Sequence, residues 1–148
     1  MLGRLAIGTA LTLGVAAEAN GVFMLVAPTD WYFAVPGVTT TGAFNQHFIR
    51  DIGLIFLFIG TAFLLGVARP KLRVALWAAA TLWLWCHALF HFWEVAAGIC
   101  EPFVLARDFP AVTLPALLGT AITCWASWAR RAARAPEPET RRHVRLWA

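Results

Sequence analysis

Charged residues are scarce in this sequence. Asp, Glu, Lys and Arg together make up 14% of its 148 residues, whereas 60% of the residues are hydrophobic. A soluble domain of this length is typically about a quarter charged and about half apolar. The scarcity of charge therefore argues against a water-soluble domain. It predicts an integral membrane protein of one domain, with most of its mass inside the bilayer.

Cysteines and histidines are also few, and this narrows the chemistry. The three cysteines, Cys86, Cys100 and Cys124, show no C-x-x-C spacing, so neither a disulfide framework nor a zinc ribbon is predicted. The four histidines are fewer than membrane desaturases and hydroxylases carry. The sequence also lacks the G-x-S-x-G, Walker and dinucleotide-binding glycine motifs. No familiar enzyme class is indicated, and the question of whether the protein is an enzyme stays open.

What the sequence does have is a series of four long apolar runs. About 20 apolar residues are enough for a helix to cross a bilayer. The first run continues beyond Ala17-Glu18-Ala19, a small-x-small pattern that resembles a signal-peptide cleavage site, and is therefore expected to remain as a span. Short links predict an all-α, up-down-up-down four-helix transmembrane bundle over residues 1–129. Its helices are expected at residues 5–27, 45–68, 74–98 and 111–129, followed by a basic cytoplasmic tail at 130–148.

Lys and Arg are unevenly distributed between the links, and this predicts an orientation. The link between the second and third runs holds Arg69, Lys71 and Arg73, and six arginines lie in residues 130–148. The two longer connections hold only Arg50 and Arg107. Because basic residues favour the cytoplasmic side, both termini are expected in the cytoplasm. Beside a membrane span, the basic tail indicates attraction to anionic membrane lipid rather than binding of nucleic acid.

The most informative stretch runs from Trp83 to Glu94, inside the third apolar run. His87 and His91 are four residues apart, and Glu94 follows three residues later. On a helix these offsets place all three side chains on one face. Ionisable groups at such depth in a membrane are costly and usually mark a pathway, a relay or a ligand site. The stretch therefore predicts the position of a functional site.

Ionisable groups on two other expected helices lie at a similar depth. His91, Asp51 and Glu18 are each roughly 9–13 Å from the outer end of their helix, at 1.5 Å per residue. Two imidazoles one turn apart can hold one metal ion, and carboxylates can complete its shell. The predicted metal ligands are His47, Asp51, His87, His91 and Glu94. Supporting roles are expected for Glu18, for Arg50 as the partner of a carboxylate, and for Asn45 at the helix start.

Two functions are compatible with these residues. The first is a metal or redox site that holds iron, copper, manganese or zinc. A haem group would need two facing axial histidines. His47 together with His87 or His91 would supply them, but the spacing of these residues does not require a haem. The alternative is a non-enzymatic membrane protein. Its polar groups would hydrogen-bond across the helices and fix their register, or line a pocket for a small ligand, a lipid or a quinone. In both cases the protein could act as a homo-oligomer or as a subunit of a membrane complex.

Two motifs carry a resemblance to other proteins. Residues 45–53, Asn-Gln-His-Phe-Ile-Arg-Asp-Ile-Gly, and residues 87–94, His-Ala-Leu-Phe-His-Phe-Trp-Glu, resemble those of a group of small, uncharacterised four-helix bacterial membrane proteins. The expected topology is also similar to that of DoxX-like proteins. The resemblance implies a location in the bacterial inner membrane, and it implies no particular activity.

Overall fold

The computed structural model describes residues 1–134, and this range consists of helices joined by turns, without a strand. The elements are α1 (Leu2–Val26), α2 (Pro28–Ala34), the 3-10 turn η1 (Val38–Thr40), α3 (Gln46–Ala68), α4 (Arg73–Ala96), α5 (Phe103–Asp108) and α6 (Thr113–Ala132). The prediction of an all-α chain is confirmed for these residues. The predicted tail overlaps the last turn of α6, which holds Arg130 and Arg131. Its part beyond residue 134 lies outside the described residues.

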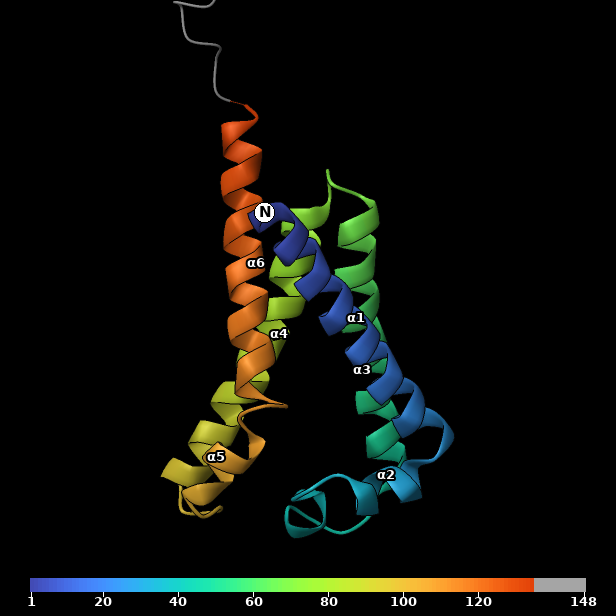
Figure 1. Cartoon of the computed structure of the whole chain (residues 1–148). Coiled ribbons are helices and arrows are strands. Elements are labelled where there is room, and N and C mark those ends of the chain that lie inside the picture. Colours follow the sequence, from blue (N-terminus) through green and yellow to red (C-terminus); the bar gives the residue numbers. More distant parts are fainter. Residues whose placement is uncertain (135–148) are drawn as a thin grey trace, which may run out of the picture.

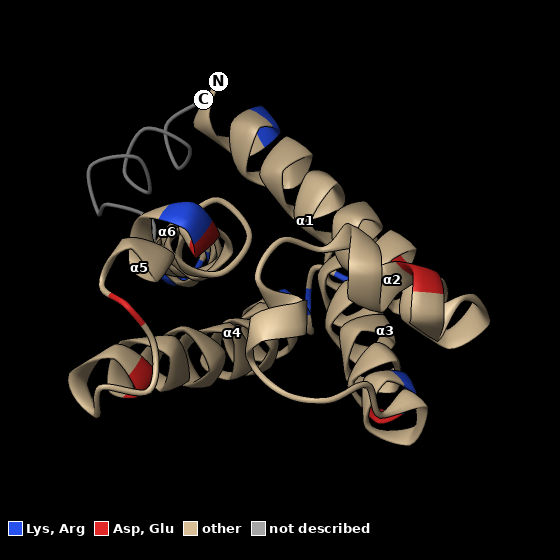
Figure 2. Cartoon of the chain, turned by 90° about the horizontal axis from the view of Figure 1, so that it is seen from below, with Lys and Arg blue, Asp and Glu red and all other residues tan. Residues whose placement is uncertain are grey.

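The four long helices alternate in direction and form two pairs (Figure 1). Helix α1 packs along α3, and α4 packs along α6. The pairs meet near the N-terminus and the α3–α4 turn, and they diverge toward the end where α2 and α5 lie. Seen from that end, the start of α3 and the end of α4 are far apart, and most of the ribbon carries no charged residue (Figure 2). The described helices therefore do not show the predicted bundle closed along its whole length.

The position of the core explains why the pairs meet at one end. Trp77 of α4 and Phe63 of α3 are fully buried there, and Nε1 of Trp77 donates a 3.0 Å hydrogen bond to the carbonyl of Phe63. Small residues such as Ala10 of α1 and Ala116 of α6 complete this core. The last buried residue of α4 is Ala88. The C-terminal part of α4 therefore lacks comparable packing and is free to diverge from α3.

Glycines bring α1 and α3 into close contact. A Cβ atom added to Gly21 would lie 2.7 Å from the carbonyl oxygen of Gly53, and one added to Gly60 would lie 2.8 Å from that of Gly14. Small residues allow helix backbones to approach this closely, and a larger side chain at these positions would have to push the helices apart. Gly14 and Gly21 of α1 thus lie directly against Gly60 and Gly53 of α3.

Local signals set the ends of the long helices. Pro28 begins α2 directly after α1 stops, at the first-turn position that proline tolerates. Pro70 follows the end of α3, and Gly98 has a left-handed φ of 72° just after the end of α4. Asn45 caps α3, because its side chain accepts a 3.1 Å hydrogen bond from the backbone N–H of Phe48. The observed bounds consequently differ from the predicted ones by only a few residues.

Three of the helices in residues 1–134, α1, α3 and α4, are long and apolar enough to cross a membrane. Large apolar side chains on their outer faces are exposed, including Leu54, Phe58, Leu82 and Leu89. In water such a surface would be costly, whereas in lipid it is the expected one. These helices give the chain the character of a membrane protein.

Candidate functional site

Helix α4 places its two histidines next to each other near its C-terminal end. The ring centroids of His87 and His91 are 4.8 Å apart, with their planes at 83°. His87 also stacks on Trp83, one turn earlier, with a centroid distance of 5.1 Å and an angle of 17°. The regular helix and the stacked indole fix the orientation of His87. The two imidazoles share one face of the helix, as predicted.

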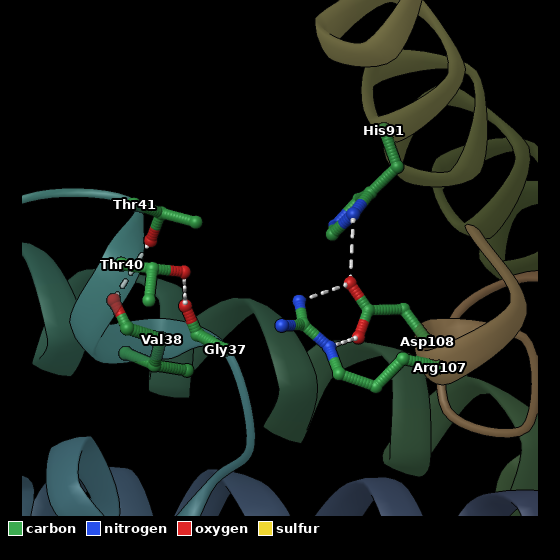
Figure 3. A network of polar contacts seen from close by, with 7 residues as sticks. All are labelled: Gly37, Val38, Thr40, Thr41, His91, Arg107 and Asp108. Atoms are coloured by element: carbon green, nitrogen blue, oxygen red, sulfur yellow. Dashed lines mark hydrogen bonds and ion pairs between the residues drawn. The ribbon is translucent and has the colours of Figure 1, made fainter. Parts of the chain in front are cut away.

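Helix α5 brings a carboxylate to this pair of histidines (Figure 3). The chain turns after α4 and folds back, so that Oδ2 of Asp108 lies 3.5 Å from Nδ1 of His91. Both side chains are largely shielded, with 19% of His91 and 14% of Asp108 exposed. Arg107 donates two hydrogen bonds to the same carboxylate, from Nε to Oδ1 at 2.7 Å and from Nη2 to Oδ2 at 3.0 Å.

The contacts of Asp108 set the charge state of Arg107 and the tautomer of His91. The bidentate pair between Arg107 and Asp108 is charge-assisted and geometrically specific, and the hydrogen bond to Asp108 raises the pKa of Arg107 above its usual value. A carboxylate beside Nδ1 of His91 favours the tautomer that carries its hydrogen on that atom. Nε2 of His91 then keeps a free lone pair, which can accept a proton or bind a metal ion.

Arg107 also contacts the connection between α2 and η1. Gly37 in this connection has a left-handed φ of 87°, and a Cβ atom added there would overlap the guanidinium of Arg107. Figure 3 shows the guanidinium pointing toward this loop, in which the hydroxyls of Thr40 and Thr41 donate to the carbonyls of Gly37 and Val38. Arg107 therefore links the cluster on α4 and α5 to the connection that joins α1 and α3.

The predicted ligands at the start of α3 form a separate pair. Nε2 of His47 lies 3.3 Å from Oδ2 of Asp51, and the two side chains are 86% and 55% exposed. They are four residues apart and share one face of α3. Within residues 1–134, no ion pair joins them to α4, and the start of α3 and the end of α4 diverge (Figure 1). The structure does not bring His47 and Asp51 to the two histidines of α4.

The residues expected to support the site make other contacts. Arg50 donates from Nε to the carbonyl of Leu25 at 3.2 Å, so it binds the end of α1. Among residues 1–134, no ion pair joins it to a carboxylate. Asn45 acts as a helix cap. Glu18 accepts a 2.8 Å hydrogen bond from the hydroxyl of Thr61 on α3. Glu18 therefore faces α3, and its hydrogen bond leads to α3 and not to the histidines.

Glu94 lies beyond His91 on α4 with its side chain half-buried. Its backbone carbonyl accepts hydrogen bonds from Ile99 and Cys100 at the turn that ends the helix. Across the described range 1–134, no group of three or more His, Cys, Asp or Glu side chains is arranged to hold a metal ion. The predicted five-residue metal cluster is therefore not shown. The structure shows instead a histidine pair with Asp108 behind one of its members.

Sequence reasoning did not place Asp108 and Arg107 in the site. The only signal for them was an adjacent Arg and Asp in the connection after the helix that carries both histidines. Spacing along one helix cannot reveal such a contact, because it depends on how the chain turns back.

The fold and the cluster define a class of protein: a helical chain with membrane-protein character and a polar group of His, Asp and Arg at one end of its helices. The chain matches no protein-family model, and no similar curated protein or solved structure was found.

Proposed function

We propose that the protein has four membrane spans, α1, α3, α4 and α6, in a bacterial inner membrane, with both termini in the cytoplasm. The apolar character of α1, α3 and α4 supports this, as does the packing of α6 along α4. The distribution of Lys and Arg supports the orientation. The similarity to DoxX-like topology is part of the same proposal. With this orientation, His87, His91 and Asp108 lie toward the outer surface of the membrane.

The function we assign to this cluster is binding of a transition metal ion by His87 and His91. One observation carries the assignment: the carboxylate of Asp108 lies beside Nδ1 of His91. Histidines that bind metals commonly donate their other ring N–H to a carboxylate, which fixes the tautomer and makes the ligand more basic. Asp108 thus acts behind the ligand and is not itself a ligand.

The donor atoms narrow the choice of ion. Imidazole nitrogen suits zinc, copper and iron, whereas manganese prefers oxygen ligands. Of the four ions expected from the sequence, manganese therefore fits least well. Two protein ligands leave coordination positions to water, a substrate or another subunit, so the site is one that a homo-oligomer or a larger complex could complete.

A purely structural network is the competing function. In that case Arg107, Asp108 and His91 only satisfy one another and hold α5 against α4. The absence of a three-residue metal group in residues 1–134 favours it. A metal site and a structural network differ in metal content, which can be measured directly.

Metal analysis of the detergent-purified protein tests the proposal. Protein purified without chelator and offered zinc, copper, iron and manganese in turn should retain at least one of them in stoichiometric amount. His87→Ala and His91→Ala should each abolish retention while the protein still inserts and folds, because the main core lies elsewhere on α4. His47→Ala is the matched control, since its exposed side chain lies at the start of α3. Absence of metal from wild-type protein would favour the structural network, and retention by both α4 variants would mean that the metal binds at other residues; either result would overturn the proposal.

A further inference from the structure

The charged residues of the described chain are segregated between its two ends. The N-terminus, the α3–α4 turn and the C-terminal part of α6 lie at the same end of the molecule (Figure 1). This end, called the basic end below, holds every Lys and Arg of residues 1–134 except Arg50 and Arg107. The acids of this range lie toward the opposite end, apart from Glu18 in the middle of α1. The basic end therefore carries positive charge that no acid among the described residues balances locally.

One of these cations is held by the protein itself. Arg73 donates to the carbonyls of Gly66 and Val67 at 2.9 and 3.2 Å, and its guanidinium lies over the ring of Trp77. The other cations of the basic end, Arg4 among them, form no ion pair with a carboxylate within residues 1–134. Their counter-charge has to come from outside this part of the chain.

An open groove leads from the basic end along α1. It has a volume of about 290 Å³, and its lining comes from α1 between Arg4 and Leu13 and from Leu118 of α6. Arg4, Gly8 and Thr12 of this lining are spaced by four residues and therefore lie along one line of the helix, over about 12 Å. A Cβ atom added to Gly8 would meet nothing within 4 Å. The groove thus begins at a cation and continues into the span over a glycine.

The surroundings of the groove indicate its occupant. Helix α1 is apolar enough to cross a membrane, so an open groove on it is filled by lipid chains. Arg4 lies near the start of α1, at the level where the phosphates of the lipids lie. Basic residues beside membrane spans attract anionic headgroups. A groove of this size lies at the lower end of small-molecule sites, about 300–1,000 Å³, so it can take one chain but cannot enclose a whole lipid.

We propose that one anionic phospholipid binds at this groove, with its phosphate at Arg4 and one acyl chain beside Gly8. The proposal rests on the membrane-spanning position of α1 in the proposed function. It depends neither on the orientation of the protein nor on the histidine pair. Its failure would therefore leave the metal site untouched, because metal content is measured separately.

Native mass spectrometry of the detergent-purified full chain, titrated with lipid, tests the proposal. Wild-type protein should retain one phosphatidylglycerol per chain saturably. Its affinity for zwitterionic phosphatidylcholine should be about tenfold lower or less, because several basic residues lie near the headgroup. Glycerol phosphate, which has the anionic group without the chains, should not displace the lipid at equal concentration.

Two matched pairs of variants test the two halves of the site. Arg4→Gln should weaken the binding of phosphatidylglycerol by about fivefold, the effect of one basic residue at an anionic headgroup. Arg69→Gln, which removes an exposed cation of the same end, should have a much smaller effect. Gly8→Leu fills the groove and should weaken binding as well. Ala79→Leu is its control, because Ala79 is exposed and lies as far from the start of α4 as Gly8 lies from the start of α1.

Three results would overturn the proposal. If wild-type protein binds both lipids equally well, or if Arg4→Gln has no larger effect than Arg69→Gln, no headgroup is held at Arg4. If Gly8→Leu binds phosphatidylglycerol as Ala79→Leu does, no acyl chain lies in the groove. If glycerol phosphate displaces the lipid, the basic end holds a free phosphate group rather than a phospholipid.

Discussion

At the scale of single residues, Asp108 determines what His91 can do. An asparagine has nearly the same size, but its amide donates as well as accepts hydrogen bonds, so it no longer selects one tautomer of the imidazole. For Asp108→Asn we expect metal affinity to fall by about 10–100-fold, with helix content by circular dichroism unchanged. Glu101→Gln, which removes an exposed acid from the same connection, should not alter the affinity. Equal affinities for Asp108→Asn and wild type would show that the carboxylate has no part in metal binding.

The same scale shows how much of the site could be predicted from sequence. His87 and His91 were found because a spacing of four residues on a helix is a local property. Asp108 was not found because its contact arises only when the chain turns back after α4. Asp51 was predicted at a depth similar to that of His91. Depth along a helix, however, does not say which helices are neighbours, and the two pairs diverge at this end (Figure 1).

At the scale of elements, the α1–α3 contact leaves no room for a larger side chain at Gly60. A Cβ atom on Gly60 would lie 2.6 Å from Cγ of Glu18 and 2.8 Å from the carbonyl oxygen of Gly14. Gly60→Ala should therefore destabilise the protein, by about 1–3 kcal/mol as for other overpacked positions, measured by unfolding in detergent. Gly8→Ala is the matched control, because a Cβ atom there meets nothing within 4 Å, and alanine favours the helix by up to about 1 kcal/mol. Equal stability of the two variants would contradict the close contact.

Element positions were largely predictable, but element pairing was not. Apolar runs and the prolines at positions 28 and 70 mark the long helices, because both act locally. The splayed arrangement depends on where large side chains are buried. Trp77 and Phe63 concentrate the contact between the pairs near one end, whereas a pattern of apolar residues only says that a helix is apolar. Helices α2 and α5, with 7 and 6 residues, are too short to show a periodic pattern.

At the scale of the whole molecule, the four-span proposal requires α6 to cross the membrane. Its 20 residues would extend about 30 Å, which matches the hydrocarbon core. Helix α6 is not among the three helices of residues 1–134 that are apolar enough by composition, since it carries Arg130 and Arg131 in its last turn and several hydroxyl side chains. Two of these hydroxyl side chains have partners within the protein. Thr120 accepts a 2.8 Å hydrogen bond from Nε1 of Trp85 and donates one to the carbonyl of Ala116. The hydroxyl of Thr123 lies 3.5 Å from that of Thr81. Partners of this kind reduce the cost of placing polar groups in lipid.

The number of spans determines on which side each connection lies, and cysteine labelling can read this out. In a background without Cys86, Cys100 and Cys124, single cysteines are placed at Thr39, Lys71 and Ala133, all exposed positions outside the long helices. With four spans and a cytoplasmic N-terminus, an impermeant thiol reagent added to intact cells should label Thr39→Cys only. Lys71→Cys and Ala133→Cys should react only after the membrane is opened. Labelling of both Thr39→Cys and Ala133→Cys in intact cells would mean three spans, because α6 and the residues after it would then lie on the outer side of the membrane. Labelling of Lys71→Cys in place of Thr39→Cys would invert the orientation, and the histidine pair of α4 would then face the cytoplasm.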